Sequence, residues 1–326
     1  MRSTVSIIIP SHCPPVECEG LLKAIGCQSL LPEEVILVRV SASVDVSNYW
    51  NAWNEFFEQK GVSLKVVEGG SVLFPGAARN LGLHYATKQF IAFLDVETIP
   101  CKHWLEGQLD RIQGSRSVGC FGSTTYAAWS FKQALVRDAI YGRRPLSTIP
   151  GSVLRKELFN LVGKFIPNIR AAEDTEWVIR AKTMGVKIAD SPHDALLSYT
   201  GLRKLGLIGL AKKWRRNYLS SRLLQHLKVQ TTVVWLLAYV AVSFIAFNWN
   251  SIVASWQVES PFYIDHVTKI VSLTPIALYI IFRGCYLPFK RGVPWVSIFP
   301  FRFLLLAAIG AILDAVKVTT IFFPRE

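Results

Sequence analysis

The stretch that decides the fold reads Phe90-Ile91-Ala92-Phe93-Leu94-Asp95-Val96-Glu97. Its first five residues are apolar, and the run is too short for a helix, so it predicts a buried strand of a parallel sheet. Asp95 and Glu97 follow at the carboxyl end of that strand, where open α/β sheets bind their ligands. Two carboxylates there can share a divalent cation, and the cation can hold a diphosphate. The alternative is a pair of solvated loop acids, because the spacing alone is a weak motif.

Strand and helix patterns alternate before this stretch. The predicted elements are, in chain order, a strand over 5–9, a helix over 16–28, a strand over 34–40, a helix over 47–59, a strand over 62–67 and a helix over 77–87. Alternation at this spacing is typical of βαβ units with right-handed crossovers. The sequence therefore predicts an α/β fold with a parallel sheet.

The pattern is more mixed after this stretch. It predicts a strand over 118–125, a helix over 131–141, a loop over 143–150 and a helix over 173–184. Glu173 and Asp174 stand in the first turn of the last helix, where the helix dipole favours acids, and Gly185 follows its end.

Charge divides the chain unevenly. The net charge is +13, but after Asp194 the acids are Glu259, Asp265, Asp314 and Glu326. From about residue 231 the chain is mostly apolar. We therefore expect a soluble-type domain over 1–200 and a membrane region over 231–326. No zinc-finger spacing or basic–aromatic pattern points to nucleic acid, which is not an expected partner.

A basic segment joins these two regions. Residues 201–230 contain eight Lys or Arg and no acid. Such a block fits the anionic cytoplasmic face of a membrane, at about 1 kcal/mol per basic residue. Its apolar side chains recur at helical spacing, which predicts an amphipathic helix in contact with membrane lipids. The alternative is an ordinary surface helix.

Three apolar stretches follow, over 231–256, 266–286 and 295–323. The first is long enough to cross a bilayer, the second is weaker, and the third either spans or is partly re-entrant. Basic residues flanking them place residues 201–230 and the segment near Lys290 inside, and the loop near Glu259 outside. We expect a multi-pass protein of the cell membrane with a cytoplasmic catalytic domain and two or three spans.

Five short segments in order give the chain a family resemblance over about residues 4–200. They are Val5-Ser6-Ile7-Ile8-Ile9-Pro10, Gly76-Ala77-Ala78-Arg79-Asn80-Leu81-Gly82, Phe93-Leu94-Asp95-Val96-Glu97, Gly151-Ser152-Val153-Leu154-Arg155 and Ala172-Glu173-Asp174-Thr175-Glu176-Trp177-Val178-Ile179-Arg180. Together they resemble glycosyltransferase family 2, whose members have a GT-A fold, which is a Rossmann-like nucleotide-diphospho-sugar transferase domain. Each segment alone is common, whereas the ordered set is specific.

The resemblance implies a donor site. Asp95 and Glu97 would hold Mg²⁺ or Mn²⁺, which prefer oxygen ligands. Pro10, Ser11, Arg79 and Asp95 would contact the nucleotide-sugar, and a guanidinium near a diphosphate is physically sensible.

The resemblance also implies an acceptor site. Asp174 is the expected general base, with Glu173 second, and the alternative for both is a helix-capping acid pair. Trp177 and Arg180 are candidate sugar contacts, although core packing is as good an explanation for Trp177. Lys213 and Arg215 are expected first at the membrane and second at a phosphate.

The chain departs from the family pattern at three places. The second strand ends with Arg39 where many members have a base-reading acid, and Asp45 is a possible substitute. Glu97 stands where Asp is usual and is one methylene longer. No His lies near Leu197-Ser198-Tyr199-Thr200, where some members have a metal ligand.

These observations predict a metal-dependent, inverting hexosyltransferase. It would move a sugar from a nucleotide-sugar to a lipid-linked or membrane-proximal glycan acceptor in cell-envelope synthesis. One alternative is a non-catalytic membrane scaffold with a degenerate GT-A domain. A processive polysaccharide synthase is a second alternative, although two or three spans are few for a polymer channel.

Overall fold

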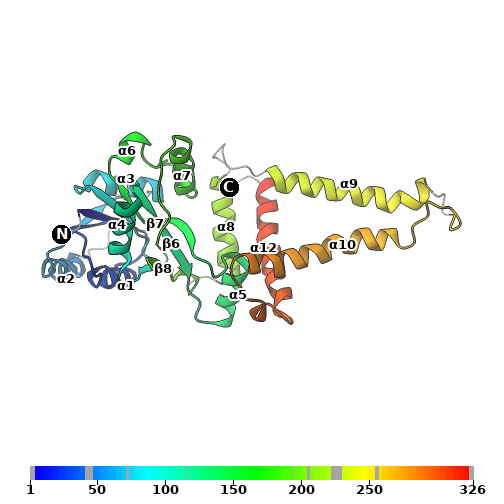
Figure 1. Cartoon of the computed structure of the whole chain (residues 1–326), viewed down its shortest axis with the longest axis horizontal. Coiled ribbons are helices and arrows are strands. Elements are labelled where there is room, and N and C mark those ends of the chain that lie inside the picture. Colours follow the sequence, from blue (N-terminus) through cyan, green and yellow to red (C-terminus); the bar gives the residue numbers. More distant parts are fainter. Residues whose placement is uncertain are drawn as a thin grey trace. The chain divides into compact units, whose positions relative to one another are not determined.

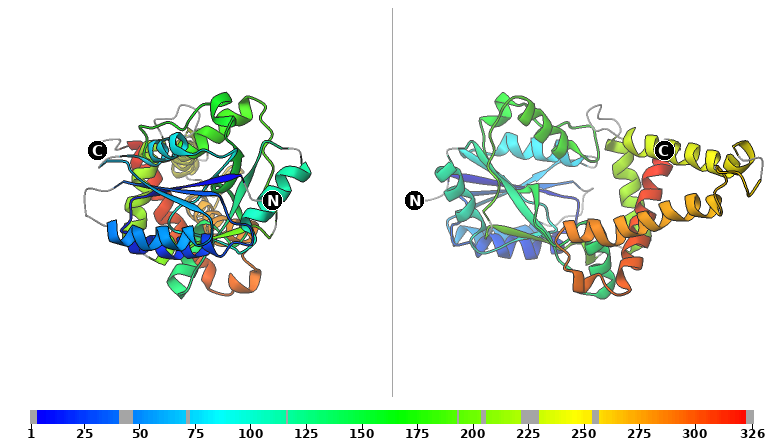
Figure 2. Two further views of the ribbon diagram at one scale, coloured as in Figure 1. Left: turned by 90° about the vertical axis from the view of Figure 1, so that its left-hand side faces the viewer. Right: turned by 45° about the vertical axis from the view of Figure 1, so that its right-hand side comes forward.

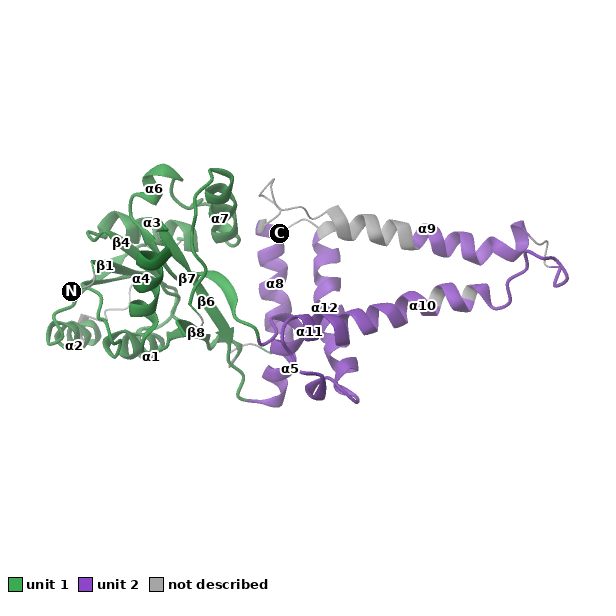
Figure 3. Cartoon of the chain, viewed as in Figure 1, with its two compact units in different colours: residues 1–129, 144–206 green, residues 130–143, 207–326 purple. Residues whose placement is uncertain are grey.

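The computed structural model describes residues 4–40, 47–70, 73–115, 117–192, 194–203, 206–221, 230–253 and 257–322. The chain forms two compact units, coloured separately in Figure 3. Unit 1 comprises residues 1–129 and 144–206, and unit 2 comprises residues 130–143 and 207–326.

Unit 1 is built around an eight-stranded sheet with the order β3-β2-β1-β4-β7-β6-β8-β5. Its first half contains β1 (Val5–Ser11), α1 (Pro15–Gly26), β2 (Glu34–Arg39), α2 (Ser47–Glu58), β3 (Ser63–Glu68), α3 (Pro75–Tyr85) and β4 (Phe90–Phe93). These four strands are parallel, as predicted. Their carboxyl ends therefore share one edge of the sheet.

The second half of the sheet differs from the prediction. It contains β5 (Thr98–Pro100), α4 (Trp104–Ser115), β6 (Gly119–Tyr126), β7 (Leu146–Arg155), α6 (Leu158–Leu161), α7 (Glu173–Thr183) and β8 (Leu196–Tyr199). β7 runs antiparallel to β4 and β6, and β5 runs antiparallel to β8, so the sheet is mixed. The predicted loop over 143–150 is wrong from Leu146 on, because this segment pairs with β6, with Leu146 opposite Thr124.

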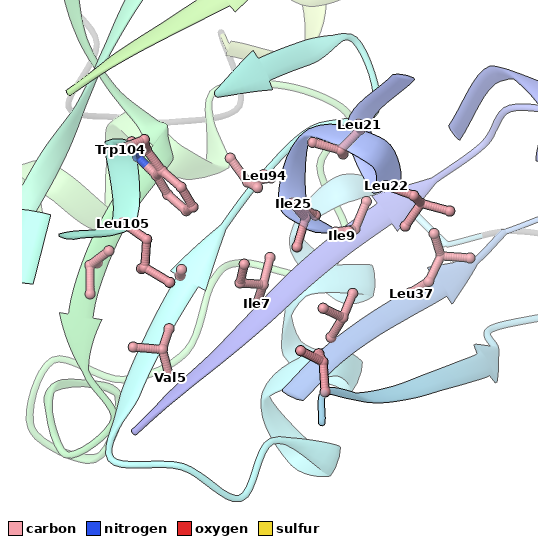
Figure 4. Packing of buried hydrophobic residues seen from close by; sticks show 14 of the residues in the cluster. Val5, Ile7, Ile9, Leu21, Leu22, Ile25, Leu37, Leu94, Trp104 and Leu105 are labelled. Carbon is pink, nitrogen blue, oxygen red and sulfur yellow. The ribbon is translucent and has the colours of Figure 1, made fainter. Parts of the chain in front are cut away.

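The core lies on both faces of the sheet because successive strand residues point to opposite sides. Val5, Ile7 and Ile9 of β1 pack on one face with α1, α2 and α4 (Figure 4). Ile8 packs on the other face with α3, α6 and α7. Helices on both faces explain why the strands are apolar without alternation.

Unit 2 is helical. It contains α5 (Phe131–Ile140), α8 (Leu207–Ser221), α9 (Gln230–Ile252), α10 (Val267–Ile281), the π-helical turn η2 (Phe282–Tyr286), α11 (Leu287–Lys290) and α12 (Arg302–Phe322). A short 3-10 turn, η3 (Trp295–Ser297), precedes α12, and another, η1 (Gly201–Arg203), lies at the end of unit 1. In Figures 1 and 2, α9 and α10 lie side by side as a hairpin, and α8 and α12 run next to each other across the direction of that hairpin.

Among the residues of unit 2 that the structure describes, two segments are long and apolar enough to cross a membrane, Lys269–Lys290 with 22 residues and Arg302–Thr320 with 19. The first predicted span coincides with α9, of which Val240–Ile252 is a shorter apolar helix. The third predicted span begins late, because its helix starts at Arg302 rather than at residue 295. Of the predicted basic helix, α8 covers Leu207–Ser221, and residues 222–229 lie outside the described residues.

Helix α5 belongs to a different unit from the one that the sequence predicts. The sequence places residues 131–141 within the catalytic domain, yet α5 packs with α11 and α12 in unit 2. Its carboxylate Asp138 is fully buried and pairs with Arg137, Arg143 and Arg302. The sequence predicted this helix, but a local pattern does not identify which neighbours cover it.

Candidate active site

Asp95 stands one residue beyond Leu94 at the carboxyl edge of the sheet, in a tight turn. The Thr98 hydroxyl donates to the Asp95 carbonyl at 2.6 Å, and the Thr98 amide donates to the same oxygen at 2.9 Å. This turn fixes the backbone of both acids. The Asp95 side chain remains 38% exposed, which leaves it accessible to a ligand.

Glu97 is held by the segment that ends β8. The Tyr199 hydroxyl donates to Glu97 Oε2 at 2.6 Å, while the Thr200 amide and hydroxyl donate to the Glu97 carbonyl at 2.8 and 3.0 Å. Gly201 leaves room for this pair, because a Cβ on it would lie 2.3 Å from Glu97 Oε2 and 2.4 Å from the Tyr199 hydroxyl. Tyr199, Thr200 and Gly201 are site residues that the sequence analysis missed, although it had singled out this strand for its missing His.

Arg79 connects the two acidic segments. Its guanidinium donates from Nη2 to Asp95 Oδ1 at 3.3 Å and from Nη1 to Glu173 Oε1 at 2.5 Å. The side chain is only 5% exposed, and its guanidinium lies over the Phe165 ring. Burial opposes its charge, but Asp95, Glu173 and Asp174 together raise the pKa of Arg79. Arg79 thus links the two acidic segments, and its contact with a nucleotide stays a prediction.

Glu173 begins α7 next to α3. A Cβ on Gly76 would lie 2.3 Å from the Ile166 carbonyl and 3.2 Å from Glu173 Cγ, so only glycine permits this approach. Ala172, the residue before the helix, has φ of 71°, a left-handed conformation that is unfavourable for alanine. Burial raises the pKa of Glu173, Arg79 opposes this rise, and the Asp174 charge adds to it.

Asp174 is partly exposed, unlike the buried Glu173 beside it. Its Oδ1 accepts hydrogen bonds from the Thr175 amide at 2.7 Å and the Thr175 hydroxyl at 3.3 Å. Of these two neighbouring acids, Asp174 is therefore the one that is accessible to a ligand.

Pro10 and Ser11 end β1 at the same edge as Asp95, and both are buried. Ser11 pairs in register with Arg39 of β2, whose Nη1 donates to Glu68 Oε1 of β3 at 2.6 Å. An acid of β3, Glu68, thus lies next to the end of β2 and is paired with Arg39. Asp45, the substitute considered from the sequence, lies outside the described residues.

The Trp177 and Arg180 side chains make their contacts within the protein. Trp177 is fully buried, stacks on Phe159 and donates to the Gly163 carbonyl at 2.8 Å. Arg180 pairs with Glu176 and donates to the Val162 and Lys164 carbonyls. The structure therefore favours the core-packing alternative for Trp177 and corrects its assignment as an acceptor contact, because it has no exposed surface.

Lys213 and Arg215 lie on α8 in unit 2, where both are partly exposed. The structure brings together Asp95, Arg79, Glu173 and Asp174 in unit 1, and Glu97 follows Asp95 two residues later, with its side chain held by Tyr199.

Asp95 and Glu97 fit a hard cation in their donor chemistry, since both offer carboxylate oxygens. Mg²⁺ is usually held by one or two carboxylates, with water and substrate phosphates completing the shell. Within the residues that the structure describes, no group of three or more His, Cys, Asp or Glu is placed to hold a metal. A two-carboxylate site completed by a diphosphate is consistent with this arrangement.

The family model for glycosyl transferase family 2 matches residues 6–175, which include both acidic segments. The chain belongs to this family. The model thereby covers the GT-A sheet as far as the start of α7, and this family 2 chain continues into the apolar helices of unit 2.

Known relatives agree with this family and fold. Glycosyltransferase AglE of Haloferax volcanii is 22% identical over 205 residues, which cover 59% of this chain and 65% of AglE. The family 2 chain thus spans slightly less than two thirds of that relative.

A solved structure shows a similar fold. Mannosyltransferase PcManGT from Pyrobaculum calidifontis, in complex with GDP-Man and Mn²⁺, has a TM-score of 0.58 and 16% identity, and the match covers 100% of this chain and 89% of that one. TarS of S. aureus has a TM-score of 0.47 and 16% identity, covering 94% of this family 2 chain and 55% of TarS.

Proposed function

We propose that this chain is a membrane-bound, inverting glycosyltransferase that moves a sugar from a nucleotide-sugar to a lipid-linked or membrane-proximal acceptor, as in cell-envelope glycan synthesis. The observation that carries the proposal is the connected set of charges at the carboxyl edge of the sheet. Arg79 links Asp95, at the donor side, to Glu173, which adjoins the accessible Asp174.

The donor half of the site consists of two held carboxylates. Asp95 is held by Arg79 and its turn with Thr98, and Glu97 is held by Tyr199. When bound there, Mg²⁺ or Mn²⁺ would supply Lewis-acid stabilisation of the leaving nucleoside diphosphate. The protein's own part is to hold both acids in a fixed orientation before the donor arrives.

The acceptor half centres on Asp174. With a hydroxyl acceptor, the Asp174 carboxylate takes the hydroxyl proton while the oxygen bonds to the anomeric carbon and the bond from that carbon to the diphosphate breaks. A lipid phosphate acceptor is already ionised near pH 7, so Asp174 would then orient it without removing a proton.

The rival from another class is a membrane scaffold with a degenerate GT-A domain. Its support is that Glu97 has a purely structural partner in Tyr199, and that Arg79 and Glu173 form a buried pair that would stabilise the fold without any ligand. A processive synthase is ranked lower because two segments meet the criteria for a membrane span among the described residues.

A ligand screen separates enzyme from scaffold. The purified full chain in detergent is heated with a panel of nucleotide-sugars, GDP-Man and UDP-GlcNAc among them, with and without Mn²⁺. A donor at about 100 times its Kd stabilises by about 2.7 kcal/mol, which is a readily measured rise in Tm.

The matched controls are Asp95→Asn at the site and Asp110→Asn on the exposed part of α4. We expect the first variant to abolish the metal-dependent shift and the second to retain it. A flat response to every donor with Mn²⁺ would support the scaffold and overturn the transferase proposal.

A further inference from the structure

The last apolar helix, α12, carries an interaction surface that the family match does not cover. Its length and composition alone suit a third membrane span. Its three charged residues, Arg302, Asp314 and Lys317, are spread over its length. The partners of these charges indicate how the helix is oriented.

The first of these charges ties the start of α12 to α5. Arg302 Nη2 donates to Asp138 Oδ2 at 2.9 Å. Helix α5 is joined to β6 and β7 by linkers of only four and five residues, 127–130 and 141–145, which span at most about 20 Å. A bilayer core is about 30 Å thick, so α5 stays on the membrane face that carries the sheet.

The middle of α12 is tied to the end of α10. Arg283 in the π-helical turn donates to both oxygens of Asp314, at 2.7 and 2.6 Å, and the Tyr279 hydroxyl donates to Asp314 Oδ2 at 2.9 Å. This end of the hairpin reaches α5 as well, since Arg291 donates to the Ile140 carbonyl at 2.6 Å. Asp314 therefore lies near the same membrane face as α5.

The third charged residue, Lys317, contacts α8. The Lys317 ammonium lies over the Tyr218 ring, 5.2 Å from its centroid. Residues along α12, from Arg302 to Lys317, thus contact α5, the end of α10 and α8 in turn. Figures 1 and 2 show the same arrangement, with α12 and α8 running across the α9–α10 hairpin.

Small residues allow α12 to pack closely against the π-helical turn η2. A Cβ on Gly284 would lie 2.3 Å from the Phe303 carbonyl, and a Cβ on Gly310 would lie 3.0 Å from Arg283 Nε. Small residues at both contacts let the two backbones approach.

The opposite face of α12 is apolar and uncovered. Its exposed positions recur at spacings of three and four residues, namely Leu304, Ala308, Ile312, Ala315 and Thr319. None of them is charged, and the charged residues all face protein partners. This one-sided pattern is typical of a helix that lies in a membrane interface.

We propose that α12 lies in the plane of the membrane on the catalytic face, with its Leu304–Thr319 stripe in the headgroup–acyl boundary of the bilayer, and that only the α9–α10 hairpin crosses. The proposal rests on the membrane attachment proposed above. It predicts an even number of crossings, so the C-terminus returns to the side of the catalytic unit.

An orientation assay on the full chain tests this. One epitope precedes Met1, a second follows Glu326, and a third is inserted after Glu259 in the loop between α9 and α10. Sealed vesicles with the catalytic face outward are treated with protease. We expect the first and second epitopes to be lost at the same rate, and the third to be lost only after detergent is added.

Two results would overturn the proposal in different ways. A protected C-terminal epitope means that α12 crosses as a third span. Cleavage of the Glu259 epitope without detergent means that the hairpin does not cross, and then the spanning attachment fails too. Fusions of GFP and of alkaline phosphatase after Glu326 give an independent readout, because GFP fluoresces in the cytoplasm and the phosphatase needs oxidised disulfides. We expect fluorescence without phosphatase activity.

Discussion

At the residue scale, the unusual acid Glu97 is explained by its partner. Tyr199 donates to it at 2.6 Å from the end of β8, and Gly201 leaves room for the pair. The extra methylene of Glu97 lets its carboxylate reach this strand, so the longer side chain has a structural reason.

Removing the Tyr199 hydroxyl tests the prediction that Glu97 is a metal ligand. Tyr199→Phe deletes the hydrogen bond that orients Glu97, and losses of this kind typically cost about 10–100-fold in metal affinity or activity. We expect the Mn²⁺ concentration for half-maximal activity to rise by a factor in that range. Tyr85→Phe, which removes an exposed hydroxyl on α3, is the matched control. An unchanged metal requirement in Tyr199→Phe would argue against Glu97 as a ligand.

Substitution of Asp174 distinguishes a hydroxyl acceptor from a lipid phosphate acceptor. If it removes a proton from a hydroxyl acceptor, Asp174→Asn should lower kcat by about 100-fold or more, since general base catalysis contributes that much. Initial rates at saturating donor measure this, with Asp110→Asn as a control for lost negative charge. A near-normal rate would contradict the base assignment and favour an acceptor that is already ionised.

At the element scale, the Arg79–Glu173 pair fastens α3 to α7. Arg79→Met would leave the Glu173 carboxylate buried without its partner, which typically costs about 3–5 kcal/mol. Arg79→Met combined with Glu173→Met removes both charges and should recover most of this loss. Thermal unfolding of the purified chain measures both. Equal destabilisation in the single and the double variant would mean that the pair is not coupled.

The buried carboxylate of Asp138 likewise connects α5 to neighbouring segments through ion pairs. Burial would raise the pKa of Asp138, but hydrogen bonds from Arg143 and Arg137, with their charges, lower it below its ordinary value. The stability from this group is therefore present above the unfolded value near 4 and is lost as pH falls through the lower folded pKa.

Asp138→Asn should remove that pH dependence. We expect the variant to be less stable than the parent at pH 7, with the difference shrinking in acid as the parent's own carboxylate is protonated. Melting temperatures in detergent at pH 7 and at lower pH supply the comparison. A constant difference at all pH values would show that the Asp138 charge is not the stabilising feature.

At the scale of the whole molecule, the α9–α10 hairpin should make membrane attachment permanent. Helices that span a bilayer resist extraction by alkaline carbonate, whereas proteins held by interfacial helices and charge are released. We expect the full chain to remain in the membrane pellet after such a wash, with a peripheral protein of the same membrane as the released control. Release of this chain would contradict a spanning hairpin.

Local patterns predicted much of the fold because they depend on neighbours in sequence. The strands at 34–40 and 62–67 and the helices at 47–59 and 173–184 match β2, β3, α2 and α7 to within one residue at each end. In the second half of the sheet, the strand predicted over 118–125 corresponds to β6, whereas β5 and β7 were missed. Whether Leu146–Arg155 is loop or strand depends on pairing with β4 and β6, and those partners are remote in sequence.

The sequence by itself determined the GT-A domain, the acids Asp95, Glu97, Glu173 and Asp174, and the apolar C-terminal region, because periodicity and ordered motifs are local properties. Only the tertiary structure decided what these residues touch. It showed that Arg79 is a buried link between Asp95 and Glu173 and that Trp177 is part of the core, and it added Tyr199 as the partner of Glu97. Burial and charge pairing join segments far apart in the chain, so no pattern along the sequence encodes them.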